Sequence, residues 1–583
     1  MTPTESSHTP SKSEPRLQQH GTGVTVVLFF LISGILGILP IPEELKPVDL
    51  STQESRQAVI DRVLQKPEMR FSMDEERGEG DFELEPEPFD DAELNEPEME
   101  TLSRANDSVD AGSQEATASF VRAGMNVNKE IRRLRRMAKV LKAPGSVIEN
   151  PCIRKDASTC RETALGTFFR RLDEIDRAQQ KTSPEQPSST VQARIVALGN
   201  SLIASDHVTD IVRERLTDRF GDAGRGFLLP DRLSKVAGRR VRTGRGSSSW
   251  EINTFAQKKP RMTHFGFSGS HHQSSKKGDA ISWAMRGSTD ATLFWLSHPG
   301  GPEIELLVDG QNVATLTTAA AEPTSMLKQM MLPAGGKTLR LLAKGKNAVI
   351  YGVSLQNQKA GVSWDTVGVP ASDSKIYVQK TSKEIFKSQL AAREPSLVVA
   401  MVGGNEVRSM SFGWATLDDV RGWYASFLDR IKEAAPDASC LAVAPIDAAK
   451  ATAAGARLTT RKQVAPVVAM QKEVAFEKGC AFFDLFNAMG GKGALQRFHR
   501  KGLIHDDLVH PRGKGGDILG QLFADALFDA YLTTPVPANS SGPTDPLESA
   551  SKPADRRPNT PPHSDEEVQK EEERPARPLR EDL

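Results

Sequence analysis

The sequence is poor in aromatic residues and in cysteine. Phe, Trp and Tyr together make up 6% of its 583 residues, and four cysteines occur. Glycine at every third position and multiple long apolar runs are also missing. These absences exclude collagen-like proteins, multi-span membrane proteins and small disulfide frameworks. Hydrophobic residues account for 38% of the chain, which indicates that extended polar segments dilute an ordinary folded core.

Several common functional motifs are missing as well. Neither the GxSxG nucleophile motif nor a GxxxxGK[ST] or GxGxxG phosphate-binding motif occurs, so an α/β-hydrolase elbow and a nucleotide site lack support. The cysteine spacing matches no zinc pattern. His271 and His272 are adjacent without a nearby Asp, Glu or Cys pattern, so we expect a solvated loop there rather than metal ligands. We therefore expect no metal and no cofactor.

Charge is unevenly distributed along the chain. The formal net charge is −1, but residues 74–100 carry fourteen acids against one base, whereas residues 101–535 have a net charge of about +17. A basic folded region favours polyanionic partners such as acidic polysaccharide, anionic lipid or nucleic acid. The alternative is that the acidic segments simply offset this charge in solution.

Residues 24–39 form an uncharged apolar run of 16 residues, VTVVLFFLISGILGIL. This length is marginal for a membrane span, which needs about 20 residues. A secretory signal is the alternative, but no small-residue cleavage pattern follows the run. Lys12 and Arg16 precede it and two glutamates follow it, so we expect a signal anchor with the rest of the chain in the periplasm or at the cell surface. Nucleic acid is then not an expected partner.

Two polar segments flank the middle of the chain. Residues 43–118 are acidic and punctuated by proline, and residues 535–583 are similar in composition. We expect both to be disordered, with folding on a partner as the alternative. The four cysteines fit two disulfide pairs in an oxidising compartment. Cys152 and Cys160 are close in sequence, while Cys440 and Cys480 each open an apolar run and could meet on neighbouring parallel strands.

Short continuous apolar runs alternate with helical patterns in much of the remaining sequence. This alternation predicts a parallel sheet covered by helices on both faces, with ligands at the carboxyl ends of the strands. The predicted strands are residues 193–198, 396–402, 440–446 and 481–486, and the predicted helices include residues 120–141, 163–180, 419–434 and 459–478. Between them, residues 246–360 show short β-type pieces separated by turn clusters, which indicate an inserted β-sandwich or jelly roll.

Aromatic and basic residues in and near this insertion allow two interpretations. Trp250, Trp283 and Trp295 could stack on sugars, although packing inside a sandwich is the stronger expectation for at least two of them. The basic run at residues 232–261 fits a solvated face best and a clamp for an anionic glycan second.

Three polar motifs lie at the edge where the predicted sheet would bind ligands. Ser201, in Gly-Asn-Ser, follows the first strand, and Asn405, in Gly-Gly-Asn-Glu, follows the second. Asp507 and His510 lie in an Asp-Leu-Val-His motif before the last helix. A carboxylate can orient one imidazole nitrogen while the other nitrogen takes the serine proton, and an asparagine amide can stabilise an oxyanion. Each motif alone is weak evidence, but their order and placement predict a serine hydrolase.

With these motifs the chain resembles the SGNH/GDSL hydrolases, which are serine esterases of a three-layer flavodoxin-like α/β/α fold. The resemblance implies Ser201 as nucleophile, His510 as general base and Asp507 as its partner. It implies an oxyanion hole formed by Asn405 and the backbone amides of Ser201 and a second-block residue. That residue aligns with Ala371 where the family has glycine, with Gly368 as the alternative donor.

The inserted β-rich segment resembles a subgroup of bacterial envelope enzymes that remove O-acetyl groups from peptidoglycan or other polysaccharides. The resemblance implies an esterase for an acetylated polysaccharide, working through an acyl-enzyme without a cofactor. One alternative is a non-catalytic glycan-binding scaffold in which Asn200, Ala371 and Glu406 mark a decayed site. The other is a lipase or thioesterase of the same fold.

The predicted organisation along the chain has eight parts. They are a cytoplasmic tail (1–22), a transmembrane signal anchor (23–42), a disordered acidic linker (43–118), a helical extension (119–190), the first part of the hydrolase domain (191–245), a carbohydrate-binding-like β-sandwich (246–360), the second part of the hydrolase domain (361–534) and a disordered tail (535–583).

Overall fold

The structure is a computed structural model that describes residues 128–156, 159–180, 190–233, 243–260, 262–451 and 458–534. The predicted membrane anchor, acidic linker and C-terminal tail lie outside these residues, as do residues 234–242 and 261 of the predicted basic run. Within the described ranges no helix combines the length and the apolar character that a membrane span requires.

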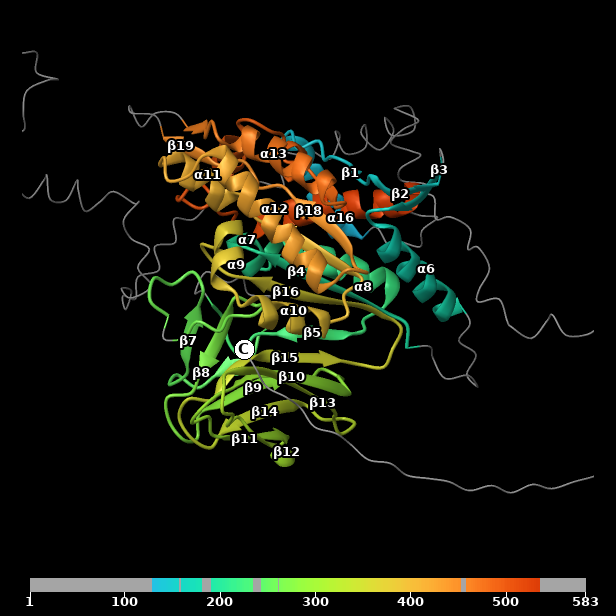
Figure 1. The fold of residues 1–583 in the computed structure, drawn as a ribbon. Coiled ribbons are helices and arrows are strands. Elements are labelled where there is room, and N and C mark those ends of the chain that lie inside the picture. The colour runs from blue at the N-terminus through green and yellow to red at the C-terminus, as the bar shows by residue number, and fades with distance from the viewer. Residues whose placement is uncertain are drawn as a thin grey trace, which may run out of the picture. The chain divides into compact units, whose positions relative to one another are not determined.

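A mainly parallel sheet forms the centre of the α/β region (Figure 1). Its strands run in the order β21-β18-β17-β4-β16, and β1 (Ile148–Glu149) adds an antiparallel edge to β21. Counted along the chain, the parallel strands follow the 2-1-3-4-5 order of flavodoxin-like doubly wound sheets. The four predicted strands are all present, as β4 (Gln192–Gly199), β17 (Leu397–Met401), β18 (Ser439–Val443) and β21 (Ala481–Phe483), and β16 (Gly361–Gly368) is the fifth.

Helices cover both faces of this sheet because its strands are apolar on both sides. Ile195 and Ala197 of β4 belong to one core cluster, and Val196 and Leu198 to the other. The first face is covered by α5 (Lys129–Val140), α6 (Gly166–Gln180), α8 (His207–Phe220) and α16 (Gly513–Thr533). The second is covered by α9 (Ser374–Lys380), α10 (Lys383–Ala391), α12 (Leu417–Ala434) and α13 (Val464–Glu477).

One predicted helix differs from the structure. The helix predicted for residues 459–478 begins only at Val464, because Thr459 lies in β20 (Leu458–Thr460), which pairs with β19 (Ala449–Ala451). After the first parallel strand the chain forms α7 (Ser201–Ala204) and then α8 as two separate helices, because Asp206 between them has a φ of 58°. A left-handed residue cannot continue a right-handed helix.

Residues from 224 to 356 contribute two antiparallel sheets that share one core. One sheet has the order β13-β10-β15-β8-β7, with β5 also paired to β15, and the other has the order β12-β11-β14-β9-β6. Their bounds are β5 (Gly224–Leu228), β6 (Arg245–Gly246), β7 (Glu251–Thr254), β8 (Ser270–Gln273), β9 (Ala280–Ala284), β10 (Asp290–Ser297), β11 (Glu303–Val308), β12 (Gln311–Thr317), β13 (Thr324–Met331), β14 (Thr338–Ala343) and β15 (Val349–Gln356).

This two-sheet region is joined to the α/β region by apolar packing and by a buried ion pair. Phe294 and Tyr351 of its first sheet belong to the same core cluster as Val196 of β4. Arg393, just after α10, pairs with Asp365 of β16 at 2.6 Å and donates a 2.6 Å hydrogen bond to Ser354 of β15. Asp365 also accepts a 2.7 Å bond from the Phe227 amide of β5. One charged pair therefore connects strands of both regions.

The structure corrects the expectation of a solvated loop at His271 and His272. Both residues lie in β8 and are fully buried, and His271 stacks on Phe265 at 5.0 Å between ring centroids. Burial lowers the pKa of His271 to about 4 and that of His272 to about 3. Adjacent histidines gave no signal of this in the sequence, because packing partners from distant segments decide their burial.

The tryptophans of the two-sheet region are packing residues. Trp250, Trp283 and Trp295 are all buried, and their indole N–H groups donate to Ala280, Leu229 and Ser297 at 2.9–3.1 Å. Their ring faces are therefore not available to a sugar. The two disulfides form as expected, Cys152 with Cys160 and Cys440 with Cys480. The second links β18 to the start of its parallel neighbour β21.

Candidate active site

Ser201 lies at the junction of β4 and α7, at the carboxyl edge of the parallel sheet. Gly199 allows this sharp junction, because a side chain there would collide with the Met401 carbonyl and with Ile203. Asn200 is buried, and its side-chain oxygen accepts a 3.0 Å bond from the Leu202 amide. Asparagine thus caps α7 and sets the position of the following serine.

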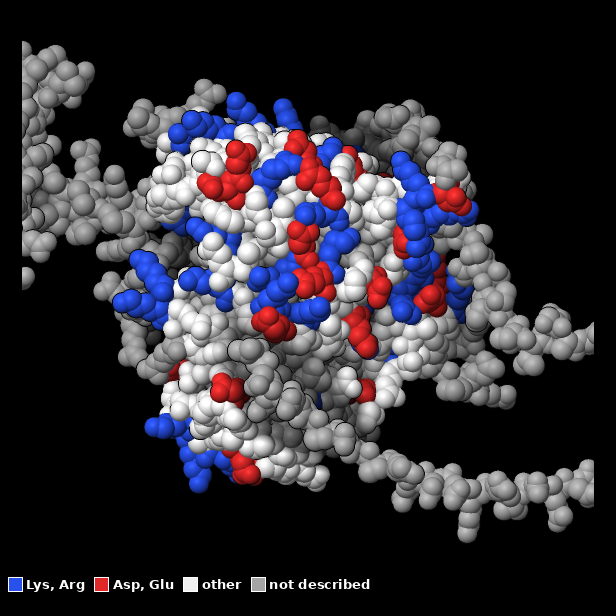
Figure 2. All heavy atoms as spheres, in the orientation of Figure 1, with Lys and Arg blue, Asp and Glu red and all other residues white. Residues whose placement is uncertain are grey.

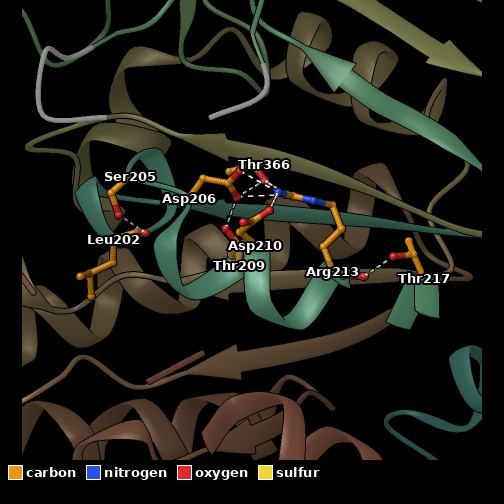
Figure 3. A network of polar contacts seen from close by, with 8 residues as sticks. All are labelled: Leu202, Ser205, Asp206, Thr209, Asp210, Arg213, Thr217 and Thr366. Carbon is orange, nitrogen blue, oxygen red and sulfur yellow. Dashed lines mark hydrogen bonds and ion pairs between the residues drawn. The ribbon is translucent and has the colours of Figure 1, made fainter. Parts of the chain in front are cut away.

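A buried polar network fastens α8 to β16 directly behind this junction (Figure 3). Arg213 donates to both carboxylate oxygens of Asp206, at 3.0 and 2.9 Å, and to Thr366 of β16 at 3.2 Å. Thr366 in turn donates to Asp206 at 2.9 Å, and Arg213 also pairs with Asp210. Burial opposes the charge on Arg213, but its acidic neighbours raise the pKa above its ordinary value. The network fixes the segment that follows the nucleophile.

The loop between α15 (Ala494–Arg500) and α16 brings Asp507 and His510 to the same edge. Leu508, with a φ of 58°, turns the chain back, and Asp507 Oδ1 accepts 2.9 Å bonds from the amides of Val509 and His510. Asp507 Oδ2 lies 2.6 Å from His510 Nδ1, and His510 Nε2 lies 2.6 Å from Ser201 Oγ. The predicted serine, histidine and aspartate therefore form one continuous hydrogen-bonded chain.

The electrostatics of this hydrogen-bonded Ser-His-Asp series suit His510 to act as a general base. Burial alone would raise the pKa of Asp507, but hydrogen bonds from the side chain and amide of His510 and from the Val509 amide lower it to about 2. Asp507 is thus charged at neutral pH and holds the Nδ1 proton of His510, which leaves Nε2 to accept the serine proton. The His510 and Asp507 side chains are about one-third exposed, so solvent can reach the site.

Asn405 and Ala371 follow β17 and β16, the two strands that flank β4 in the sheet. Asn405 is in the first turn of α11 (Gly404–Ser411), and its side-chain nitrogen donates a 2.7 Å bond to the Ser372 carbonyl. The amide carries a second N–H, which this bond leaves available to an oxyanion. Ala371 has a φ of 63°, so its backbone adopts the left-handed conformation in which the family's glycine is unstrained.

Gly368, the alternative second-block donor, has a packing role of its own. Gly368 is the last residue of β16 and pairs in register with Gly199. A side chain on Gly368 would collide with the backbone of α7, including the Asn200 carbonyl oxygen at 2.7 Å. This glycine is therefore required for close packing of α7 on the sheet.

Glu406 has a structural role in the site that sequence reasoning did not assign. It is buried, and its carboxylate accepts 2.8 Å bonds from the amides of Ser374 and Gly403. It thus ties the loop that carries Ala371 to the helix that carries Asn405. Burial, and then the neighbouring Asp373, raise the pKa of Glu406 to about 7. Its position directly after Asn405 could be read from the sequence. Its bond to Ser374 could not, because that residue lies 32 positions away.

Tyr377 and Ser372 hydrogen-bond to the end of β4, the strand that precedes Ser201. The Tyr377 hydroxyl donates to the Gly199 carbonyl at 3.0 Å, and the Ser372 hydroxyl lies 3.2 Å from the same oxygen. The second-block loop and α9 are thereby held against the end of β4. No sequence signal marked these residues, because a buried tyrosine in a helix is typical of core packing. Among the described residues, no group of three or more His, Cys, Asp or Glu could hold a metal ion.

The fold and this constellation define the class of protein: a serine hydrolase with its nucleophile at the carboxyl edge of a flavodoxin-like sheet. Residues 336–518 match the family model described as the GDSL-like lipase/acylhydrolase family. This part of the chain is therefore similar to the GDSL-like lipases and acylhydrolases. The match includes Ala371, Asn405, Asp507 and His510, whereas Ser201 precedes it and is separated from it by much of the two-sheet region.

One solved structure supports the fold. A peptidoglycan O-acetylesterase structure matches at 21% identity and a TM-score of 0.53, over 63% of this chain and 97% of that one. An acetylxylan esterase from Geobacillus stearothermophilus matches at 17% identity and a TM-score of 0.23, over 31% of this chain and 77% of that one. The first match supports the fold; the TM-score of the second is too low to inform it. No curated protein matches the sequence significantly.

Proposed function

We propose that the protein is a serine esterase that removes small acyl groups, in particular O-acetyl groups, from an envelope or extracellular polysaccharide. The observation that carries the proposal is the unbroken chain from Ser201 Oγ to His510 Nε2 and from His510 Nδ1 to Asp507 Oδ2, with 2.6 Å at each step. Such a chain generates an alkoxide-like nucleophile at neutral pH. The fold shared with a peptidoglycan O-acetylesterase supports the choice of acyl group and of polymer.

In the acylation step, His510 Nε2 takes the proton of Ser201 while the serine oxygen attacks the ester carbonyl carbon. The carbonyl oxygen becomes an oxyanion, which the Asn405 amide and the backbone N–H groups of Ser201 and Ala371 stabilise. Each such donor contributes about 3–4 kcal/mol to the transition state. The intermediate collapses when His510 returns the proton to the sugar oxygen, so the sugar leaves as an alcohol and Ser201 is acylated.

Deacylation repeats these roles with water. His510 takes a proton from a water molecule, which attacks the acyl carbon and regenerates the oxyanion. Collapse returns the proton to Ser201 Oγ and releases the carboxylic acid. The half-buried position of His510 is suitable for this step, because water must approach the same nitrogen that the leaving sugar has just vacated.

The alternative of a decayed, non-catalytic site rested on Asn200, Ala371 and Glu406. In the structure each of these residues contributes to the geometry of the site. Asn200 caps α7, Ala371 adopts the left-handed backbone that its position requires, and Glu406 joins the second-block loop to α11. These departures from the family pattern therefore do not indicate loss of activity.

The test measures acetate release from O-acetylated peptidoglycan and acetylated xylan, with p-nitrophenyl acetate as a small ester. The Ser201→Ala protein should lose at least about 10³-fold in kcat on all three substrates. A Ser205→Ala variant, which changes a neighbouring serine outside the triad, is the matched control. Unchanged acetate release from the Ser201→Ala protein would refute the catalytic assignment, and a preference for long acyl chains would indicate a lipase or thioesterase.

We infer the location of the enzyme from the sequence. The apolar run at residues 24–39 would anchor it in the cell membrane, with the hydrolase domain in the periplasm or at the surface, and the two-sheet region would assist in binding the carbohydrate. The two disulfides support an oxidising compartment. Membrane fractionation of the full chain against a chain that begins at residue 43, with protease digestion of intact cells, tests the anchor and its orientation.

A further inference from the structure

Trp414 is an exposed aromatic residue on the α/β region. Its side chain is 70% exposed, and it is the one aromatic residue among the exposed large hydrophobic residues of the described ranges. Tryptophan is usually largely buried, because its ring carries a large apolar surface. An indole that is left in solvent therefore calls for an explanation, particularly since the three tryptophans of the two-sheet region are all buried.

The backbone holds this tryptophan in a fixed position. The amides of Gly413 and Trp414 donate to the carbonyls of Met410 and Ser409, at 3.1 and 2.9 Å, and Gly413 has a φ of 72°. These bonds form the Schellman motif that ends α11. In that motif the residue at the position of Trp414 usually packs an apolar side chain back on the helix, whereas here most of the side chain remains outside.

Phe412 and Arg408 extend the exposed surface of Trp414. The rings of Phe412 and Trp414 lie 4.8 Å apart between centroids, at an interplanar angle of 29°, and the guanidinium of Arg408 lies 5.8 Å from the Phe412 ring. The stack limits rotation of the indole before any ligand binds, so little conformational entropy remains to be lost on binding. The three residues, called the aromatic platform below, combine flat apolar faces with a cationic group.

The aromatic platform is connected to the candidate active site through one short helix. α11 begins at Gly404, next to Asn405, and spans eight residues, or about 12 Å. Glu406 fixes its first turn to Ser374, and the Ser411 hydroxyl near its end bonds Gln463 at 3.1 Å. The distance between oxyanion donor and platform is thus set by a helix that is fastened at both ends.

We propose that Trp414, Phe412 and Arg408 form a subsite for a sugar residue of the polysaccharide chain, a few residues from the sugar that carries the ester. The proposal rests on the esterase function proposed above. The C–H face of a pyranose ring is apolar and covers an indole face well, while its hydroxyl and carboxylate groups can accept hydrogen bonds from a guanidinium. A small ester such as p-nitrophenyl acetate is too short to reach from Ser201 to this platform.

The kinetic test compares a polymer with a small ester. The Trp414→Ala protein should show kcat/KM on acetylated xylan or O-acetylated peptidoglycan reduced about tenfold, mainly through KM, with p-nitrophenyl acetate hydrolysis unchanged. Trp414→Phe should restore most of the loss, and Arg408→Ala should cause a smaller one. Val140→Ala, which truncates another exposed apolar residue on α5, is the matched control and should have no effect. Equal losses on polymer and small ester, or no loss on either, would overturn the proposal.

A binding measurement separates this proposal from the esterase assignment. In the Ser201→Ala background, calorimetric titration with the acetylated polymer should give saturable binding that Trp414→Ala weakens about tenfold. If the polymer binds in this way but wild-type protein releases no acetate, the subsite stands and the esterase function fails. If wild-type protein releases acetate but the two proteins bind the polymer equally, the subsite fails alone. Binding of phospholipid vesicles in place of the polymer would identify the platform as a lipid-contacting surface instead.

Discussion

The α/β region and the two-sheet region differ in how their polar side chains are hydrogen-bonded. At the carboxyl edge of the parallel sheet, Asn405 and Glu406 make hydrogen bonds that reach another segment of the site, and Asp507 orients His510. In the two-sheet region, neither ring nitrogen of His272 has a hydrogen-bond partner among the described residues, and the three tryptophans bond to groups within that region. The first region uses polar groups to build a site, and the second uses large residues to fill a core.

Sheet topology explains this difference. Parallel strands all end at the same edge, so the residues that follow β4, β16 and β17 are brought together, and loops from elsewhere can join them. Antiparallel strands place alternate connections at opposite ends, so the turns of the two-sheet region are divided between two rims. Figure 2 shows acidic and basic side chains interspersed over the α/β half on the face in view, so charge does not mark the site on that face.

The largest expected effect comes from removing the carboxylate that orients His510. Asp507→Asn should lower kcat on p-nitrophenyl acetate by about 10³- to 10⁴-fold, with little change in KM, because the imidazole loses its preferred tautomer and orientation. Since the pKa of Asp507 is about 2, wild-type activity should not depend on its titration above pH 4. Asp506→Asn, which alters the neighbouring exposed carboxylate, is the control. Comparable losses of kcat in both variants would show that the loop conformation, rather than the Asp507 carboxylate, determines the activity.

The next largest effect tests whether the two regions unfold as one. Arg393→Met should lower the free energy of unfolding by about 3–5 kcal/mol, because it leaves Asp365 as an unpaired buried charge. Urea unfolding followed by circular dichroism measures this loss. The control is Glu394→Gln, which breaks the exposed ion pair with Arg194 and should cost at most about 1 kcal/mol. If the wild type unfolds in one step and the Arg393 variant in two, the ion pair couples the regions.

The smallest effect is an opposite response of the two regions to pH. The pKa of His272 is lowered to about 3, so the unfolded state takes up protons first and stability falls as pH drops below 6.5, by about 2 kcal/mol at pH 5. The pKa of Glu406 is raised to about 7, so the unfolded state loses its proton first. Stability then falls as pH rises from 4.5 to 7, again by about 2 kcal/mol between pH 5 and 7.

Thermal unfolding at pH 5, 6 and 7 distinguishes these two contributions. His272→Gln should weaken the loss of stability on acidification, and Glu406→Gln should weaken the loss on moving toward neutral pH, each in its own direction. Parallel pH profiles for the wild type and both variants would show that neither group titrates with folding.

Much of the catalytic assignment could be made from the sequence, and particular residues show why. Ser201, Asp507 and His510 each lie in a short motif next to a strand end or a helix start, and such local signals can be recognised without coordinates. Glu406 and Tyr377 could not be assigned in this way, because their partners Ser374 and Gly199 are distant in sequence. The misassigned histidine pair illustrates the same limit, since burial in β8 depends on residues such as Phe265 and Tyr351.

The sequence by itself determined the alternation of strands and helices, the order of the catalytic motifs and the cysteines available for pairing, because these follow from local side-chain chemistry and spacing. Only the tertiary structure decided which polar groups meet. It closed the 2.6 Å contact between residues 201 and 510, placed Ala371 in the left-handed conformation, and buried three tryptophans while leaving Trp414 exposed. The physical reason is that burial and contact are set by segments far apart in the chain, which no local pattern encodes.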